Sequence, residues 1–188
     1  MGNSASSSLP ALEPASSCNT AQFMGTWFVI GVKPTIFERT CSNAVEKYSL
    51  VDKSYDVNID FQYNQNDAIS SKLKSLPQKG WVLGKDKTNS SNWKVSPAWP
   101  IKLPYIILEV DEDDHCVIGY PSRDYCWIMS RKPQMDEKQY SGILKTLETK
   151  HKYDLKGLRK VPQVWTKEER SKRGLDNEIP DHMLTELN

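Results

Sequence analysis

Apolar and polar residues alternate most regularly in the segment that begins at Tyr55 and ends at Tyr63. Within it Val57, Ile59 and Phe61 are separated from one another by polar residues. Successive side chains of a β-strand point to opposite faces, so this period of two predicts a strand with one buried and one solvated face.

Shorter alternating or apolar runs recur along the chain, with turn-forming residues between them. Short strands separated by regular turn signals are typical of an all-β domain that closes into a barrel. Besides 55–63, we expect strands at residues 26–32, 44–51, 79–84, 93–95, 105–110, 116–120 and 124–130, and loops at 64–67 and 86–92.

The period changes after Pro133, which blocks continuation of the preceding strand. Asp136 is suited to cap a helix, and the apolar residues that follow have the i, i+3, i+4, i+7 spacing of one buried helical stripe: Tyr140, Ile143, Leu144 and Leu147. We therefore expect one C-terminal helix, followed by a short strand at 158–164 that returns to the first strand.

The composition divides the chain into three parts. Residues 1–19 are rich in serine and are expected to be a disordered leader. Residues 20–165 hold the strands and the helix, and residues 166–188 form a polar tail with a short helix near 180–187.

Gly25 and Trp27 begin the first predicted strand, and Arg131 ends the last one. These two ends can meet at the base of a barrel, where the guanidinium would lie over the indole in a cation–π contact worth roughly 1–2 kcal/mol. Such a barrel is sealed at one end and can hold a small ligand at the other.

Three blocks of sequence resemble the lipocalin family, and within it the bacterial outer-membrane lipocalins, the plant temperature-induced lipocalins and apolipoprotein D. The blocks are Phe-Met-Gly-Thr-Trp-Phe at 23–28, Phe-Glu-Arg at 37–39 with Tyr-Ser-Leu at 48–50, and Pro-Ser-Arg-Asp-Tyr-Cys-Trp-Ile-Met-Ser-Arg-Lys-Pro at 121–133. The resemblance implies an eight-stranded antiparallel up-and-down barrel with one C-terminal α-helix.

The same resemblance implies binding and carriage of a small hydrophobic ligand: a fatty acid, a lysophospholipid, a sterol or an isoprenoid. Two alternatives stay open: an enzyme that modifies a lipid or isoprenoid on this scaffold, and an interaction module whose barrel is filled by side chains.

The cavity should be lined by inward positions of the strands. Glu46 shares a strand face with Tyr48. It either turns outward through a register shift, where it is exposed or forms a local ion pair, or anchors a ligand inside the barrel. Trp99, between two prolines, is expected in a loop near the open end, as a gate, a membrane contact or an ordinary packing residue. The cavity candidates are Glu46, Tyr48, Val57, Ile59, Phe61, Trp81, Trp93, Tyr105 and Ile107.

Charge and motifs argue against other functions. The 25 basic and 24 acidic residues leave no electrostatic footprint for nucleic acid. His115, His151 and His182 lack metal-ligand spacing, and there is no phosphate loop or nucleophile elbow, so we expect no metal, no cofactor and no catalysis. We expect a monomer or a weak dimer.

The first residues, Met-Gly-Asn-Ser-Ala-Ser, match the pattern for N-myristoylation of Gly2. One acyl chain binds membranes weakly, and palmitoylation of Cys18 would strengthen the anchor. This predicts a place in the cytosol or on the cytoplasmic face of a membrane. Export or an organelle is the alternative, and the pairing of Cys18, Cys41, Cys116 and Cys126 stays open.

Overall fold

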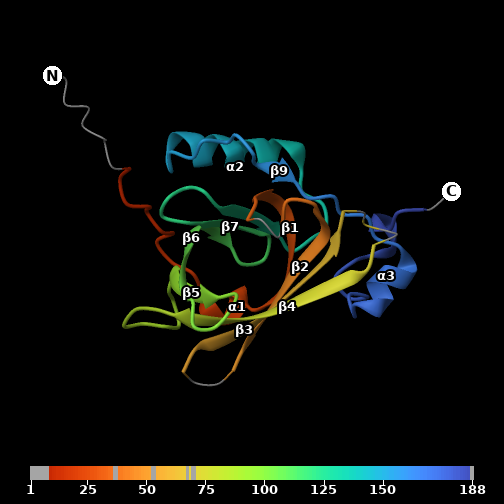
Figure 1. The fold of residues 1–188 in the computed structure, drawn as a ribbon, viewed down its shortest axis with the longest axis horizontal. Coiled ribbons are helices and arrows are strands. Elements are labelled where there is room, and N and C mark those ends of the chain that lie inside the picture. The colour runs from red at the N-terminus through yellow and green to blue at the C-terminus, as the bar shows by residue number, and fades with distance from the viewer. Residues whose placement is uncertain (1–8, 36–37, 52–53, 67, 69–70, 187–188) are drawn as a thin grey trace.

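Eight antiparallel strands form a closed barrel with a helix outside it (Figure 1). The computed structural model describes residues 9–35, 38–51, 54–66, 68 and 71–186. The strands are β1 (Gly25–Lys33), β2 (Cys41–Leu50), β3 (Asp56–Gln65), β4 (Leu73–Val82), β5 (Asn92–Ser96), β6 (Leu103–Asp111), β7 (His115–Gly119) and β8 (Cys126–Ser130).

The barrel closes through β1. Residues 25–28 of β1 pair with β2, and residues 28–33 pair with β8, with a register shift between Val29 and Gly31. A bulge of this kind bends a strand and increases its twist, which lets one strand serve two neighbours. A two-residue strand, β9 (Arg159–Lys160), also pairs with Gly31 and Val32. The closing strand predicted at 158–164 is therefore much shorter than expected.

The strand β4 begins six residues earlier than the pattern predicted. Its first half contains Pro77, which removes a donor from the ladder and weakens the strand signal. This half pairs only with β3, since β5 pairs with residues 79–82. A proline is tolerated there because that part of the strand has a single neighbour.

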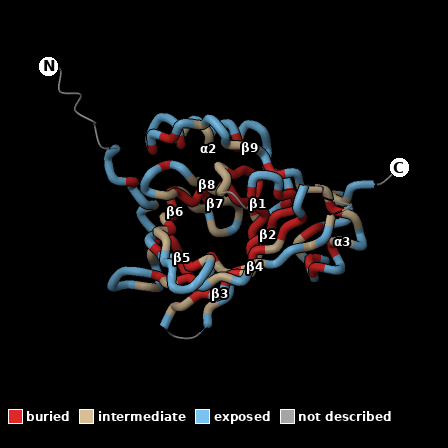
Figure 2. Tube along the Cα trace, in the orientation of Figure 1, coloured by how far each residue is buried: buried red, intermediate tan, exposed pale blue. Residues whose placement is uncertain are grey.

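Two hydrophobic clusters lie on opposite sides of the barrel wall. One fills the barrel interior and contains Trp27, Trp93 and Ile107. The other lies between the outer wall and the C-terminal elements and contains Phe28 and Trp165. Figure 2 shows the buried positions along the strands that surround the interior.

The expected helix is present as α2 (Glu137–Thr149), and the Asp136 side chain accepts hydrogen bonds from the first turn. Its buried residues are Tyr140, Ile143 and Leu147. The helix approaches β1 closely, because a Cβ placed on Gly31 would lie 2.8 Å from the Tyr140 hydroxyl. A larger residue at position 31 would therefore force the Tyr140 side chain to move.

The C-terminal segment packs against the barrel rather than extending as the polar tail that composition predicted. It forms α3 (Lys167–Lys172) and a short 3₁₀-helix, η2 (Asp181–Met183). Leu175 and Ile179 are fully buried in the outer cluster. Met183 and Leu184 are partly buried against the same cluster, so a few apolar residues suffice to attach the segment.

The N-terminal segment is also more ordered than its composition indicated. Residues 9–19 lie against the barrel: Leu12 and Cys18 are buried, and the Ala15 amide donates to the Ile107 carbonyl (2.8 Å). A single helical turn, α1 (Thr20–Phe23), follows. Gly2 and the rest of residues 1–8 lie outside the described residues.

Candidate functional site

The base of the barrel is closed by Arg131 and Trp27. The guanidinium carbon of Arg131 lies 3.6 Å from the centroid of the indole ring, the cation–π contact expected from the sequence. Gly25 has a φ of +96°, a conformation that L side chains rarely adopt, and a Cβ there would lie 3.4 Å from the guanidinium. The glycine thus allows Arg131 to reach over Trp27.

Arg131 also binds the backbone around the base. Its N–H groups donate to the carbonyl oxygens of Gln22 (2.6 Å), Met24 (3.0 Å), Thr26 (2.9 Å) and Glu112 (2.8 Å). Burial lowers the pKa of Arg131 from its usual range. The residue therefore acts as a structural seal that joins α1, β1 and the β6–β7 turn.

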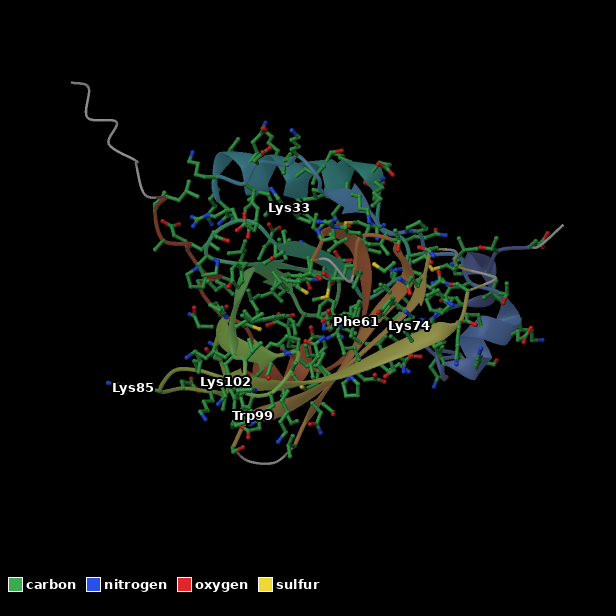
Figure 3. The ribbon with its side chains drawn as sticks, in the orientation of Figure 1. Lys33, Phe61, Lys74, Lys85, Trp99 and Lys102 are labelled. Carbon is green, nitrogen blue, oxygen red and sulfur yellow. The ribbon has the colours of Figure 1, made fainter. Side chains whose placement is uncertain are left out.

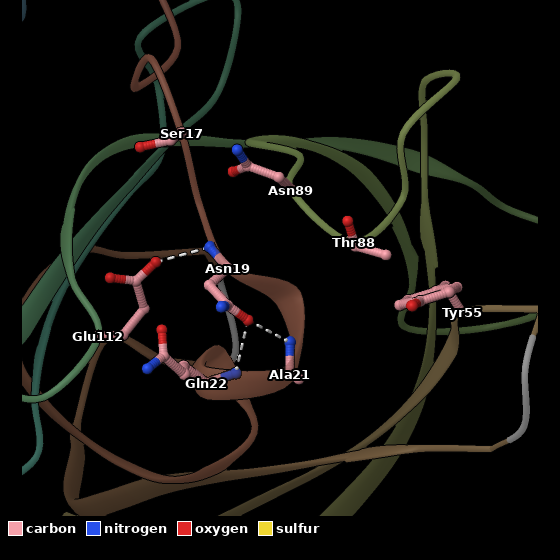
Figure 4. Close-up of a pocket in the computed structure, with 8 residues that line it drawn as sticks. All are labelled: Ser17, Asn19, Ala21, Gln22, Tyr55, Thr88, Asn89 and Glu112. Carbon is pink, nitrogen blue, oxygen red and sulfur yellow. Dashed lines mark hydrogen bonds between the residues drawn. The ribbon is translucent and has the colours of Figure 1, made fainter.

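A polar depression of about 410 Å³ lies outside this base (Figure 4). Asn19 caps α1 by accepting hydrogen bonds from the Ala21 and Gln22 amides (both 3.1 Å), and Glu112 accepts one from the Asn19 amide (2.6 Å). These hydrogen bonds fix α1 across the base of the barrel. The polar side chains of the depression are therefore explained by the attachment of α1, without a ligand.

A cavity of about 230 Å³ lies at the other end of the barrel. Its wall is mainly apolar and aromatic, with a few polar groups, as in binding sites for small molecules. In Figure 3, Phe61 lies within the barrel, whereas Trp99 and Lys102 lie together at its periphery. The lining residues are Thr35, Glu38, Glu46, Ile59, Phe61, Leu76, Gln78, Val95, Pro97, Leu103, Pro104, Tyr105, Tyr120, Tyr125 and Trp127.

Glu46 is a wall residue of this cavity and is only 7% exposed. Of the two alternatives for Glu46, the structure supports the inward one, because the carboxylate accepts a hydrogen bond from the Tyr48 hydroxyl inside the barrel. The Tyr48 and Tyr105 hydroxyls are in turn 2.6 Å apart. Burial raises the pKa of Glu46 to about 7, against the opposing effect of the Tyr48 hydrogen bond.

A second carboxylate lies near the mouth of the cavity. Glu38 accepts hydrogen bonds from the Trp127 indole N–H (2.6 Å), and from the Thr35 amide (3.0 Å) and hydroxyl (2.8 Å). Three donors hold its two oxygens in place. Together, Glu38 and Glu46 give the cavity an acidic character at two points.

Apart from Glu46 and Trp81, the cavity candidates divide into two groups. Ile59, Phe61 and Tyr105 line the cavity. The second group belongs to the interior cluster and is not part of the described lining: Tyr48, Val57, Trp93 and Ile107. Within this cluster Trp93 stacks on Tyr105 at a centroid distance of 5.9 Å.

Trp81 is not a cavity residue, and its assignment was wrong. Its neighbour Val82 points into the interior cluster, so the alternation of β4 puts Trp81 on the outer face. There the Lys102 ammonium lies 4.0 Å from the centroid of its ring. A run of two large apolar residues does not reveal which of them faces inward.

Several lining residues were missed by sequence reasoning. Leu76 and Gln78 belong to the half of β4 that the proline concealed. Thr35, Glu38, Pro97, Tyr120 and Tyr125 come from loops around the mouth, where no periodicity marks an inward position. Only the folded barrel brings these loops together.

The cysteines and His115 are further reactive groups of the chain. The four cysteines are buried free thiols, and burial raises the pKa of Cys18 to about 12 and of Cys41 to about 11. Thiols with raised pKa values are poor nucleophiles. His115 bonds to Glu109 (3.1 Å) and Asp114 (3.0 Å), yet no metal-binding group of three His, Cys, Asp or Glu side chains occurs among the described residues.

None of the helices that the structure describes has the length and apolar character needed to span a bilayer.

A barrel that is sealed at its base and holds an apolar cavity at its open end defines a calyx-type ligand-binding fold. The profile of the lipocalin-like domain matches residues 18–163, and the chain belongs to the lipocalin family. Members of this family generally bind small hydrophobic ligands and are generally carriers rather than enzymes.

Two curated relatives illustrate the similarity. Temperature-induced lipocalin-1 of Arabidopsis thaliana is 28% identical over 161 residues, which is 81% of this chain and 83% of the relative. The outer membrane lipoprotein Blc of Citrobacter freundii is 26% identical over 148 residues, which is 78% of this chain and 77% of the relative.

Solved structures show the same fold at lower identity. Insecticyanin from the tobacco hornworm Manduca sexta superposes with a TM-score of 0.63 at 14% identity, covering 86% of this chain and 88% of that one. Lobster apocrustacyanin A1 gives a TM-score of 0.59 at 15% identity, covering 78% of this chain and 81% of that one.

Proposed function

We propose that this protein binds and carries a fatty acid, lysophospholipid, sterol or isoprenoid, with the apolar part of the ligand inside the barrel. The observation that carries the proposal is the cavity bounded by Ile59, Phe61 and Leu76 on one side and Trp127 on the other. Transfer of apolar ligand surface out of water would drive binding, at roughly 25 cal/mol per Å² before the cost of ordering the ligand.

The size of the cavity limits the ligand. About 230 Å³ is below the ~300–1,000 Å³ of most ligand clefts. A single slender chain or a small ring system fits this volume best, and a bulkier ligand requires side chains at the mouth to move.

Fluorescence of a fatty-acid or retinoid-type probe tests ligand binding. We expect saturable enhancement by the wild-type protein, together with a hydrophobic molecule that co-purifies and is detected by native mass spectrometry. A protein that is folded, carries no such molecule and enhances no probe would instead be a filled-barrel module. Recovery of a chemically altered lipid after incubation would favour the enzyme alternative.

We further propose that the carrier works at a membrane surface. Trp99 and Ile101 in the β5–β6 loop are 76% and 53% exposed, and this loop borders the cavity mouth. Lys102 lies beside Trp99, and Lys79 and Lys94 project from the neighbouring outer faces of β4 and β5. Exposed indole with flanking ammonium groups suits the interface of an anionic bilayer.

Sedimentation with lipid vesicles tests the membrane contact on unacylated protein. Vesicles that contain phosphatidylserine should bind more protein than phosphatidylcholine alone, and added salt should reduce the binding. Trp99→Ala should weaken binding, whereas Lys85→Ala, in the turn between β4 and β5, should change it little. Equal binding by both variants would exclude the Trp99 loop as the contact.

Acylation of Gly2 would add a second attachment, with Cys18 as the other candidate site. Cys18 is buried in the structure, so its acylation would require residues 9–19 to detach from the barrel. The free thiols support a reducing compartment, and we propose the cytosol or the cytoplasmic face of a membrane as the location.

A further inference from the structure

The polar groups of the cavity have one sign of charge. Among the described lining residues, the charged side chains are Glu38 and Glu46, and neither a lysine nor an arginine is present. The other polar lining groups, such as Gln78 and the Tyr105 hydroxyl, are neutral. A ligand that enters therefore meets two carboxylates and several neutral polar groups, with no lysine or arginine among the described lining residues.

The two carboxylates are held at different depths. Glu46 lies on β2 and is joined to Tyr48 and, through it, to Tyr105 on β6. Glu38 lies in the β1–β2 loop and is fixed by the Trp127 indole. A ligand with its head group inward faces Glu46, and one with its head group outward faces Glu38. An anionic head group would therefore lie close to a carboxylate in either orientation.

We propose, building on the proposed function, that the calyx selects ligands by head-group charge: it binds long-chain or isoprenoid amines and alcohols and discriminates against the corresponding carboxylates. An ammonium or hydroxyl group donates a hydrogen bond to the Glu46 carboxylate. A ligand carboxylate offers only acceptors and repels the carboxylates of the wall. Coulomb interactions of this kind are strong where water is excluded.

The selection depends on pH through Glu46. The titratable groups that face it are Tyr48 on its own strand, Tyr105 from β6, Cys116 from β7 and Glu38 from the β1–β2 loop. Burial raises the pKa values of Tyr48, Tyr105 and Cys116 above their usual ranges, so these three groups stay neutral between pH 6 and pH 8. The charge of the inner cavity then changes mainly at Glu46, whose pKa is about 7.

Displacement of a fluorescent probe by decylamine, decanol and decanoate tests the inference, because the three share one chain and differ in the head group. At pH 8 we expect decylamine to bind at least about tenfold more tightly than decanoate, with decanol between them. The affinity for decylamine should rise from pH 6 to pH 8 as Glu46 ionises, while that for decanol should stay nearly constant.

Glu46→Gln keeps the size of the side chain and an acceptor for Tyr48 but removes the charge. In this variant the preference for decylamine should fall several-fold, and its rise with pH should disappear. Glu148→Gln removes the same charge from an exposed position of α2 and should leave all three affinities unchanged. Thermal melts establish that both variants are folded.

The outcomes separate this inference from the proposed function. Binding of decanoate as tight as that of decylamine, or a preference for decylamine that is undiminished in Glu46→Gln, would overturn head-group selection and leave the carrier function intact. If none of the three ligands displaces the probe and no probe binds, the proposed function itself fails.

Discussion

The guanidinium carbon of Arg131 lies 3.6 Å from the centroid of the Trp27 ring, although 104 positions separate the two residues in the chain. The same guanidinium donates hydrogen bonds to four backbone carbonyls around the base. One side chain therefore connects the residue after β8 to α1, β1 and the β6–β7 turn. The arrangement of these elements at the base of the calyx therefore depends on Arg131.

Arg131→Ala should lower the free energy of unfolding by at least about 2 kcal/mol, because it removes the cation–π contact and the hydrogen bonds to three partly buried carbonyls. Arg131→Lys should recover only part of the loss, since an ammonium lacks the planar fork that reaches several carbonyls. Urea unfolding measures both effects. An unfolding midpoint of Arg131→Ala equal to that of the wild type would show that the base does not depend on this residue.

Phe61→Asp should abolish probe enhancement by placing a carboxylate in the apolar wall of the cavity. Trp81→Ala is the matched control: it removes a larger aromatic side chain, but from the outer face, and should leave probe affinity unchanged. Circular dichroism must show that both variants are folded. Unchanged affinity in folded Phe61→Asp would remove Phe61 from the binding site.

The stability of the protein should depend on pH through Glu46. Its pKa is raised from 4.5 to about 7 in the folded state, so the folded protein binds the proton more tightly than the unfolded chain. The resulting contribution of Glu46 to the free energy of unfolding is fully present below pH 4.5 and is lost as the pH rises through 7.

Glu46→Gln should therefore gain stability relative to the wild type between pH 4.5 and pH 8, by as much as about 3 kcal/mol. Chemical denaturation of both proteins at several pH values measures the difference in their free energies of unfolding. The titration of all other groups is common to both proteins and cancels in this difference. A difference that does not change with pH would mean that Glu46 titrates normally.

Arg173→Ala should destabilise the protein by about 2–4 kcal/mol, because Arg173 joins the C-terminal segment to the barrel. Its guanidinium bonds to the Asn43 carbonyl (2.7 Å), the Asn64 side chain and Glu169 (2.8 Å), and lies 4.8 Å from the centroid of the Trp165 ring. Lys172→Ala, an exposed neighbour, should have little effect. Equal unfolding curves for the two variants would contradict the docking of α3.

Gly2→Ala should move the protein from the membrane fraction to the soluble fraction of its own cells, because the acyl chain requires Gly2. The barrel begins at Gly25, so stability and probe binding should not change. The intact mass of the isolated protein provides the direct measurement. A mass with unmodified Gly2, or with a cleaved leader and bridged cysteines, would exclude the cytosolic anchor and indicate export.

The class of fold and the closure of the base could be predicted from the amino-acid sequence. The alternation from Tyr55 to Tyr63 is a local signal, because a strand with one buried face repeats every two residues whatever lies around it. The blocks around Trp27 and Arg131 identify both ends of the barrel, and Asp136 marks the start of α2.

The positions that form the cavity became evident only in the folded barrel. A period of two separates two faces but does not say which one is inside when both carry aromatic residues, so Trp81 was misplaced. The burial of Glu46 depends on hydroxyl partners, and one of them, Tyr105, comes from a strand distant in sequence. Residues 166–186 are attached to the barrel by a few buried contacts, such as those of Arg173. The polar composition of this segment gives no sign of them, because a side chain becomes buried only when two distant surfaces pack together.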